Sequence, residues 1–179
     1  LLWVWLTIDL SAQKEDFHWC LGYNGESSQF NPPFGGIDLV FYPDSLLIRY
    51  ARRSADFDDC NASICDEHGN LLLYTNGIYA GNGSNQVLSN GRGLDEWTDN
   101  GNQARQGALI LPMPGTRGDT FFILHNFMDI VFLNGKPLGA IFDIFASMAD
   151  MDHDGGLEAE GCTAWSCIRR SAWRCCAMA

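Results

Sequence analysis

Residues 150–155 read Asp-Met-Asp-His-Asp-Gly, and their types and spacing resemble a metal-binding loop. The alternate carboxylates of Asp150, Asp152 and Asp154 can converge on a hard cation, and the final glycine permits the sharp turn of a calcium loop. The twelfth position is Gly161, where an EF-hand supplies a bidentate Glu, and no flanking helices are predicted. The alternative is a solvated turn that ends a strand. Calcium is therefore a weak candidate, and we expect no other cofactor.

No other spacing in the chain predicts catalysis. The His residues are scattered, and we expect His68 to lie exposed in a turn. The sequence lacks the G-x-S-x-G nucleophile elbow of serine hydrolases. Residues 81–83 and 91–93 begin a dinucleotide-binding pattern, but Gln86 and Glu96 replace its third glycine. We therefore predict no catalytic residue and no phosphate-binding loop.

Two sets of side chains leave a hydrolase or a sugar-binding surface open. A hydrolase requires paired carboxylates in one cleft, and the candidates are Asp58, Asp59, Asp66 and Asp95. Aromatic residues near polar segments can stack on sugars or simply pack between strands; these are Tyr42, Tyr50, Tyr79 and Trp97. Only their placement in the fold distinguishes these interpretations.

Charge and composition exclude several classes of protein. The chain has 179 residues, with 11 Lys and Arg against 22 Asp and Glu, which gives a net charge of −11. Nucleic acids and anionic membranes require a basic surface that this chain does not provide. The hydrophobic content of 46% is too high for a disordered acidic tail. A length of 179 residues fits one domain or slightly more.

The two ends differ from the body, and we expect three regions: 1–13, 14–160 and 161–179. The apolar run Leu1–Leu10, followed by small and then charged residues, resembles the end of a secretory signal peptide; a buried first strand is the alternative. The stretch 161–179 holds four of the seven Cys without paired C-x-x-C spacing. It is either a disulfide or metal knot or, as we favour, an irregular tail that results from out-of-frame translation or a truncated gene end.

The body predicts an all-β fold of antiparallel hairpins. Short apolar runs are bounded by Gly, Pro, Asn or Asp, and no run has helical spacing. The clearest predicted strands are Ile37–Tyr42, Leu46–Tyr50, Ala62–Asp66, Leu71–Thr75, Ala108–Pro112, Thr120–His125 and Ala140–Ala149. Asp66 and Gly69 predict a tight hairpin, and a second hairpin joins the runs at 108 and 120. Short strands are also expected around 78–79 and 86–88, inside the polar stretch 77–102.

The second arms of the two hairpins resemble each other at an offset of 49 residues, from Gly69 to Gly118. A repeat of this length in an all-β chain is typical of propeller blades. About three such repeats fit the body, whereas a closed ring needs 4–8 blades. We therefore expect a partial β-propeller, with a small β-sandwich as the alternative. In a partial ring, Leu71–Tyr74 and Phe121–Leu124 are predicted as edges prone to pairing.

The three Cys of the body are predicted to be small buried hydrophobes. Cys60 and Cys65 are five residues apart, so on one strand they face opposite ways and cannot form a local disulfide. Together with Cys20 they are expected to pack in the core as free thiols.

Five segments resemble motifs of a family of secreted Bacteroidota proteins. Residues 65–77 resemble its "SD-x-x-GNLLFYTNG", 88–94 its "MPNGxGL", 106–115 its "QgALilPkPG" and 148–157 its "vDMnxnGGLG". Near the start, residues 19–24 fit "W-x-FG-x-N". The matches lie in order over residues 17–157. The family's next motif, "GGLG-x-V", is not continued after Leu157.

The resemblance implies a propeller-like N-terminal repeat region of proteins exported by type IX secretion or associated with gliding motility. It supplies no catalytic residue, because the family has no established activity. From it we expect a secreted or cell-surface, non-enzymatic module for binding, adhesion or scaffolding, with a protein or glycan as its partner. A secreted propeller-type hydrolase is the alternative.

Overall fold

The computed structural model describes residues 14–23, 35–57, 59–95, 101–116, 118–152 and 168–173. All regular elements in these ranges are β-strands, which confirms the all-β prediction. The predicted region 1–13 lies outside the described residues, and of the predicted region 161–179 only Ile168–Trp173 is described. The part of the chain that is described contains no helix able to cross a membrane.

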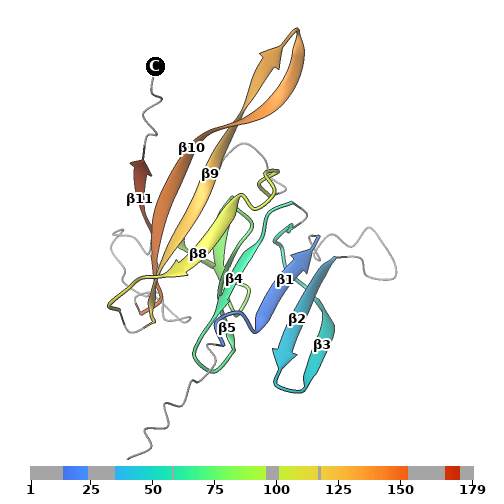
Figure 1. The fold of residues 1–179 in the computed structure, drawn as a ribbon, viewed down its shortest axis with the longest axis vertical. Coiled ribbons are helices and arrows are strands. Elements are labelled where there is room, and N and C mark those ends of the chain that lie inside the picture. Colours follow the sequence, from blue (N-terminus) through green and yellow to red (C-terminus); the bar gives the residue numbers. More distant parts are fainter. Residues whose placement is uncertain are drawn as a thin grey trace, which may run out of the picture.

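Within the described residues, eleven strands form three antiparallel sheets, each with its strands in chain order (Figure 1). The first sheet contains β1 (His18–Gly22), β2 (Gly36–Tyr42) and β3 (Ser45–Ala51). The second contains β4 (Ala62–Cys65), β5 (Leu71–Thr75), β6 (Tyr79–Asn82) and β7 (Val87–Arg92). The third contains β8 (Ala108–Pro112), β9 (Thr120–Leu133), β10 (Lys136–Asp150) and β11 (Ile168–Trp173).

The hairpin between β4 and β5 forms for the reason predicted. The Asp66 carboxylate accepts the backbone N–H groups of His68 and Asn70, each at 2.9 Å. Gly69 adopts a φ of 86°, which costs a glycine little and a side-chain-bearing residue much more. The predicted hairpin between β8 and β9 is also confirmed, with Ala108 opposite His125.

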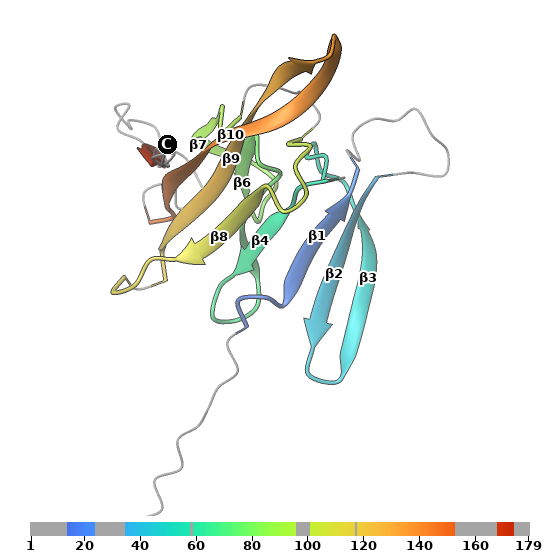
Figure 2. The ribbon, with the colours of Figure 1, turned by 45° about the horizontal axis from the view of Figure 1, so that its top comes forward.

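The three sheets are stacked through their first strands and share two apolar cores. Strands β1, β4 and β8 lie side by side in both views (Figures 1 and 2). Between the first two sheets, Cys20 and Phe57 pack with Tyr74 and Tyr79. Between the second and third sheets a larger cluster is built from Ile64, Leu73, Ala80, Leu88, Leu94, Ile110, Phe121, Ile123, Ala149 and Met151. Apolar residues on alternate positions of the strands supply these contacts.

The two outward faces of this stack are apolar and exposed. On the first sheet the outward side chains are those of Trp19, Ile37, Leu46, Ile48 and Tyr50, each more than 40% exposed. On the third sheet, Leu109, Leu111 and Ile144 are exposed in the same way, and the first and last of them line a cavity of about 310 Å³. Contiguous apolar surface of this kind is typical of interaction surfaces.

The prediction that Leu71–Tyr74 and Phe121–Leu124 are edges is wrong. They belong to β5 and β9, which lie inside their sheets and have hydrogen-bonded neighbours on both sides. Their high β-propensity and low charge suit a central strand as well as an edge, and the sequence pattern does not distinguish the two. The exposed apolar side chains lie on the outward sheet faces and toward the turn between β9 and β10 instead.

Several elements differ from their predicted extent. β1 was not among the predicted strands, and β9 and β10 continue past the predicted runs into a long two-stranded arm that projects from the third sheet (Figure 1). The polar stretch 77–102 contains β6 and β7, as its two short apolar runs indicated. The expectation that 161–179 is wholly irregular is wrong for Ile168–Trp173, which pairs with β10.

We predict that the chain self-associates through the outward faces of the first and third sheets, because both are apolar and uncovered. Replacing Ile48 (63% exposed) in Ile48→Ser, or Leu109 (51% exposed) in Leu109→Ser, should shift the chain toward monomer at a given concentration. Size-exclusion chromatography over a range of concentrations measures the shift.

The arm provides the matched control. Leu138 is 54% exposed but belongs to neither outward face, so Leu138→Ser should leave the elution profile unchanged. A monodisperse wild-type monomer at every concentration contradicts the prediction, and so does association lost only in Leu138→Ser.

Candidate binding site

The site begins with one carboxylate placed in the middle of the first sheet. Asp38 lies on the central strand β2, opposite Cys20 on β1 and Arg49 on β3. Because facing residues of adjacent strands project to the same side of a sheet, all three side chains lie on the inner face. His18, two residues before Cys20, projects to that face as well. Asp38 is only 2% exposed, so its charge must be compensated within the protein.

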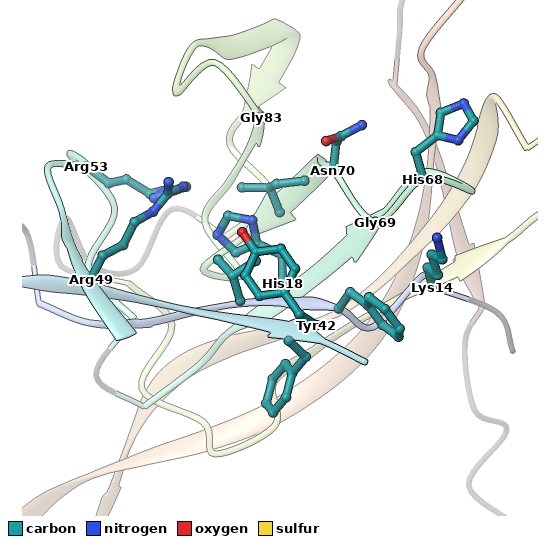
Figure 3. A pocket seen from close by; sticks show the side chains of 13 residues that line it. Lys14, His18, Tyr42, Arg49, Arg53, His68, Gly69, Asn70 and Gly83 are labelled. Carbon is teal, nitrogen blue, oxygen red and sulfur yellow. The ribbon is translucent and has the colours of Figure 1, made fainter. Parts of the chain in front are cut away.

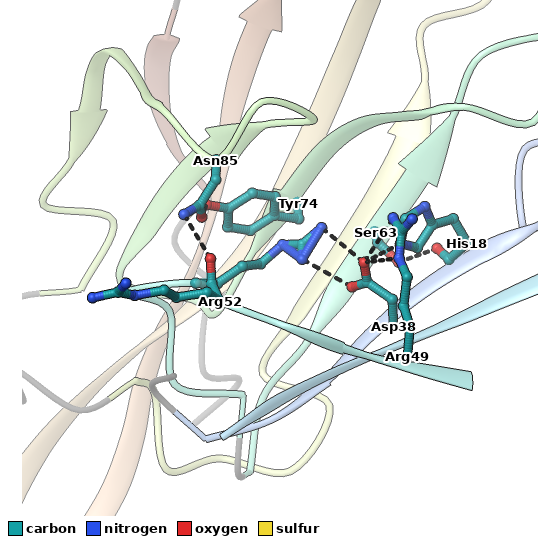
Figure 4. Close-up of polar contacts among 8 residues, drawn as sticks. His18, Asp38, Arg49, Arg52, Ser63, Tyr74 and Asn85 are labelled. Carbon is teal, nitrogen blue, oxygen red and sulfur yellow. Dashed lines mark hydrogen bonds and ion pairs between the residues drawn. The ribbon is translucent and has the colours of Figure 1, made fainter. Parts of the chain in front are cut away.

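Three cationic or protonatable groups converge on Asp38 (Figure 4). The Nε and Nη2 atoms of Arg49 donate to Oδ2 at 3.2 and 3.1 Å. Arg53 donates from Nη1 to Oδ1 at 2.8 Å and from Nη2 to Oδ2 at 3.4 Å. His18 Nε2 lies 3.1 Å from Oδ2. Such paired, charge-assisted hydrogen bonds hold both guanidinium groups in fixed orientations.

Arg53 connects this cluster to the second sheet. Its guanidinium carbon lies 5.5 Å from the ring centroid of Tyr74 on β5, within the range of a cation–π contact. The Tyr74 hydroxyl donates to Asn85, whose side-chain amide donates to the backbone oxygen of Arg52 (Figure 4). A side chain at residue 81 would clash with the Tyr74 ring at 2.5 Å, so Gly81 is required beneath it. The segment after β3 is thereby tied to two sheets.

The electrostatics of the cluster favour fixed charge rather than proton transfer. Burial by itself raises the pKa of Asp38, but the hydrogen bonds and positive charges of His18, Arg53 and Arg49 hold it below its usual value. Burial raises the pKa of the Cys20 thiol to about 12 despite the nearby Arg53. Asp38 is therefore ionised and Cys20 protonated at neutral pH, and neither group is suited to general acid–base or nucleophilic chemistry.

A cavity of about 330 Å³ opens beside this cluster (Figure 3). Its cationic or protonatable lining residues are Lys14, His18, Arg49, Arg53 and His68, and its aromatic ones are Phe17, Phe41 and Tyr42. None of the Asp and Glu residues in the described ranges lines it. Lys14, Arg49 and Arg53 bring three positive charges to this wall, against the charge of Asp38 behind it and that of Glu67, which lies 3.6 Å from His68. The cavity is therefore suited to an anion.

The same residues are poorly suited to a metal ion. His18, Cys20 and Asp38 place one potential ligand atom each within 4.8 Å of one another, the one such group of three in the described part of the chain. Two guanidinium groups already occupy the Asp38 oxygens, and their charge repels a cation. Binding would also require removal of a proton from Cys20, whose pKa is raised. We conclude that the cluster holds an anion better than a cation.

The calcium candidate is only partly within the described residues. Asp150 ends β10, and its Oδ1 accepts the backbone N–H of Asp152 at 3.1 Å, which is the bond of a solvated Asx turn. Asp154 lies outside the described residues. The structure therefore leaves the calcium prediction untested.

The other predicted chemical residues do not gather in one place. Asp66 caps its own turn, Asp95 is buried and accepts a bond from Asn102 at 2.8 Å, and Asp59 is exposed; Asp58 is outside the described residues. His68 is exposed as predicted, with 73% of its side chain accessible. His125 is buried on β9, where its Nε2 lies 3.0 Å from the Oγ of Ser147.

The predicted aromatic residues are also spread over different parts of the fold, and the predicted cysteines lie in its interior. Tyr42 lines the basic cavity, whereas Tyr50 faces outward and Tyr79 is a buried core residue. Trp97 lies outside the described residues. The body Cys residues are free and buried, which confirms the prediction for Cys20, Cys60 and Cys65.

Sequence reasoning missed the central residues of the site, although a signal was present. Asp38 stands within the apolar run Ile37–Tyr42, and Arg49 stands within Leu46–Tyr50. A charged residue inside a buried strand requires a partner of opposite charge. Opposite charges on two strands joined by a short turn therefore indicated a paired, buried charge.

Comparisons with protein-family models, with curated proteins and with solved structures find no match to this chain. The candidate site therefore rests on the geometry of its own residues.

We predict that Asp38→Asn destabilises the fold by about 3–5 kcal/mol, because it leaves the buried Arg53 guanidinium without a counter-charge. Asp44 is exposed in the turn after β2, so the matched control Asp44→Asn should change stability by at most about 0.5 kcal/mol. Urea unfolding measures both. Equal effects of the two variants contradict the role of Asp38.

The difference between wild type and Asp38→Asn should also depend on pH. The pKa of Asp38 is lower in the folded chain than its unfolded value of about 3.9. Its carboxylate therefore stabilises the fold above that value, and this contribution is lost as the pH falls through the folded pKa. Unfolding curves between pH 7 and pH 2 should show the advantage of the wild type shrinking on the acid side only.

We predict that chelation leaves the melting midpoint unchanged, because Asp150 already accepts a backbone N–H in a turn that needs no ion. Thermal unfolding in excess EDTA and then in excess calcium provides the measurement. A midpoint that rises with calcium, and falls back in Asp152→Asn, contradicts this prediction and establishes the calcium loop.

Proposed function

We propose that this chain is a non-enzymatic β-repeat module of the propeller type, secreted or displayed at the cell surface, that binds a ligand in the basic cavity. The observation that carries the proposal is the cavity itself. The guanidinium groups of Arg49 and Arg53 line it and are held in place by the buried Asp38 carboxylate, and Phe17 and Tyr42 lie beside them. Such a cavity attracts and orients a ligand. A partial propeller remains a proposal about architecture, and a small β-sandwich is its alternative.

The arrangement of the sheets supports the repeat. Three meanders follow one another along the chain, their first strands lie side by side, and a core fills each space between neighbouring sheets. Radial repetition of small antiparallel sheets is the principle of a propeller. A sandwich has two facing sheets, whereas here the middle sheet is covered on both faces.

The state of the side chains supports binding without catalysis. The carboxylate in the cluster is ionised and saturated by two guanidinium groups, and its thiol is protonated. A hydrolase needs a carboxylic acid that can give up a proton or a carboxylate free to accept one. Asp59, Asp66 and Asp95 are engaged separately or exposed, so they do not favour the hydrolase alternative.

The extracellular location rests on the resemblance of residues 17–157 to secreted Bacteroidota proteins, and the partner we expect there is a protein or a glycan. The apolar outward faces add a second surface at which further β-sheets can pack. Scaffolding through these faces and ligand binding in the cavity use different parts of the molecule.

The test incubates the immobilised chain with a defined pool of oligosaccharides and peptides and analyses the retained and unretained compounds by mass spectrometry. We expect selective retention of some compounds, recovered chemically unchanged. Charge reversal at the cavity in Arg49→Glu should abolish retention. Cleaved products that accumulate with time contradict the proposal and favour the hydrolase.

Arg52→Glu is the matched control. It makes the same change of charge close to the cluster, but Arg52 does not line the cavity. Retention that survives Arg49→Glu as well as Arg52→Glu would place the ligand elsewhere. Circular dichroism of both variants shows that the sheets are intact.

A further inference from the structure

We propose that the basic cavity binds an acidic sugar residue, with the oxyanion of the ligand on Arg49 and its ring against Tyr42. This proposal rests on the proposed function, since it names the ligand class for the same cavity. A carboxylate, as in a uronic acid, and a sulfate ester share the oxyanion chemistry that the cavity recognises.

The charge balance of the cluster points to an anionic ligand. Asp38 contributes one negative charge, whereas Arg49 and Arg53 contribute two positive charges, and Lys14 adds a third at the cavity wall. Arg53 is only 6% exposed, and its Nε is buried without a hydrogen-bond partner among the described residues. Asp38 balances the charge of one guanidinium group, so the charge of the other, on the half-exposed Arg49, has no counter-ion within the cluster. An oxyanion in the cavity supplies that counter-ion.

Arg49 is the group prepared to contact the ligand. Two of its nitrogen atoms, Nε and Nη2, are held by Asp38, while its side chain is 54% exposed and lines the cavity. The described residues offer no partner to Nη1, so this edge of the guanidinium remains available. A planar fork that is already oriented by a carboxylate loses little entropy when it binds an oxyanion.

The aromatic wall and the size of the cavity favour a sugar ring. Tyr42 is 52% exposed and lies on the inner face of β2 together with Asp38, so it combines an apolar ring with a polar tip (Figure 3). Phe17 adds apolar surface, whereas the ring of Phe41 lies on the opposite face of the sheet against Trp19, with 5.2 Å between the ring centroids. A volume of about 330 Å³ is at the lower end of small-molecule sites, which suits one sugar residue better than a long chain.

Other ligand classes fit less well. A nucleic acid carries a regular array of charge that a chain of net charge −11 repels beyond the cavity. A neutral sugar leaves the excess guanidinium charge uncompensated. A bare carboxylate, such as a peptide C-terminus, satisfies Arg49 but makes no use of Tyr42.

The experiment titrates the intact chain with four probes by isothermal calorimetry: methyl glucuronide, glucose 6-sulfate, methyl glucoside and acetate. We expect the two acidic sugars to bind at least tenfold more tightly than either methyl glucoside or acetate. The stronger of the two acidic sugars identifies the source of the oxyanion.

Variants assign the two contacts separately. Arg49→Gln should weaken the acidic sugars at least tenfold, and Arg49→Lys should recover only part of that loss, because it restores charge without the fork. Tyr42→Ala should weaken the sugars but not acetate. The matched controls are Arg52→Gln, outside the cavity, and Tyr50→Ala, a tyrosine of similar exposure on the opposite face of the sheet.

Three outcomes overturn the proposal: equal affinity for methyl glucoside and methyl glucuronide, acetate bound as tightly as the acidic sugars, or controls that lose as much affinity as the cavity variants. If the pool experiment retains other compounds in an Arg49-dependent way while acidic sugars fail here, only the ligand class is wrong. If neither experiment detects a ligand, the proposed function fails as well.

Discussion

The carboxylate of Asp38 is the constraint on which the first half of the structure depends. Because it is buried and ionised, it requires compensating groups from three directions: His18 on β1, Arg49 on β3 and Arg53 beyond it. Arg53 in turn contacts Tyr74 of the second sheet. This contact acts together with the Ser63 hydroxyl, which donates to the backbone oxygen of His18 at 2.8 Å, and with the apolar core between the two sheets. A purely apolar interface would tolerate sliding, whereas directional hydrogen bonds favour one arrangement.

Much of the local fold could be predicted because the relevant signals lie within a few residues. The Asp66–Gly69 turn and the two hairpins follow from turn residues between apolar runs. Part of the site was accessible by the same reasoning. Tyr42 and Ser45 face each other across a two-residue turn, and counting back along both strands places Asp38 opposite Arg49. Reading that register would have identified the buried ion pair.

The remainder depends on contacts between segments far apart in the sequence. Arg53 reaches Asp38 only because the chain turns back after β3, and Tyr74 lies beneath it only because the second sheet packs there. No periodicity in the sequence encodes that stacking. The misassigned edges have the same cause: the runs in β5 and β9 fit a central strand or an edge equally well, and the choice is made by their neighbours.

The arm formed by β9 and β10 carries features that oppose the addition of another strand, whereas the outward sheet faces carry none that oppose stacking. On β9, the Asp129 carboxylate accepts the backbone N–H of Ile130 at 2.7 Å, and on β10, Pro137 has no N–H to offer. Both features oppose the addition of another strand at an edge. The apolar faces have no comparable protection. In the arm the edges resist pairing, whereas the outward faces remain uncovered, so contact through sheet stacking, the packing that already joins the three sheets, is favoured over strand addition at the arm. The basic cavity, bounded by β2, the end of β3 and the β4–β5 turn, stays open in such a stack because it does not lie on either outward face.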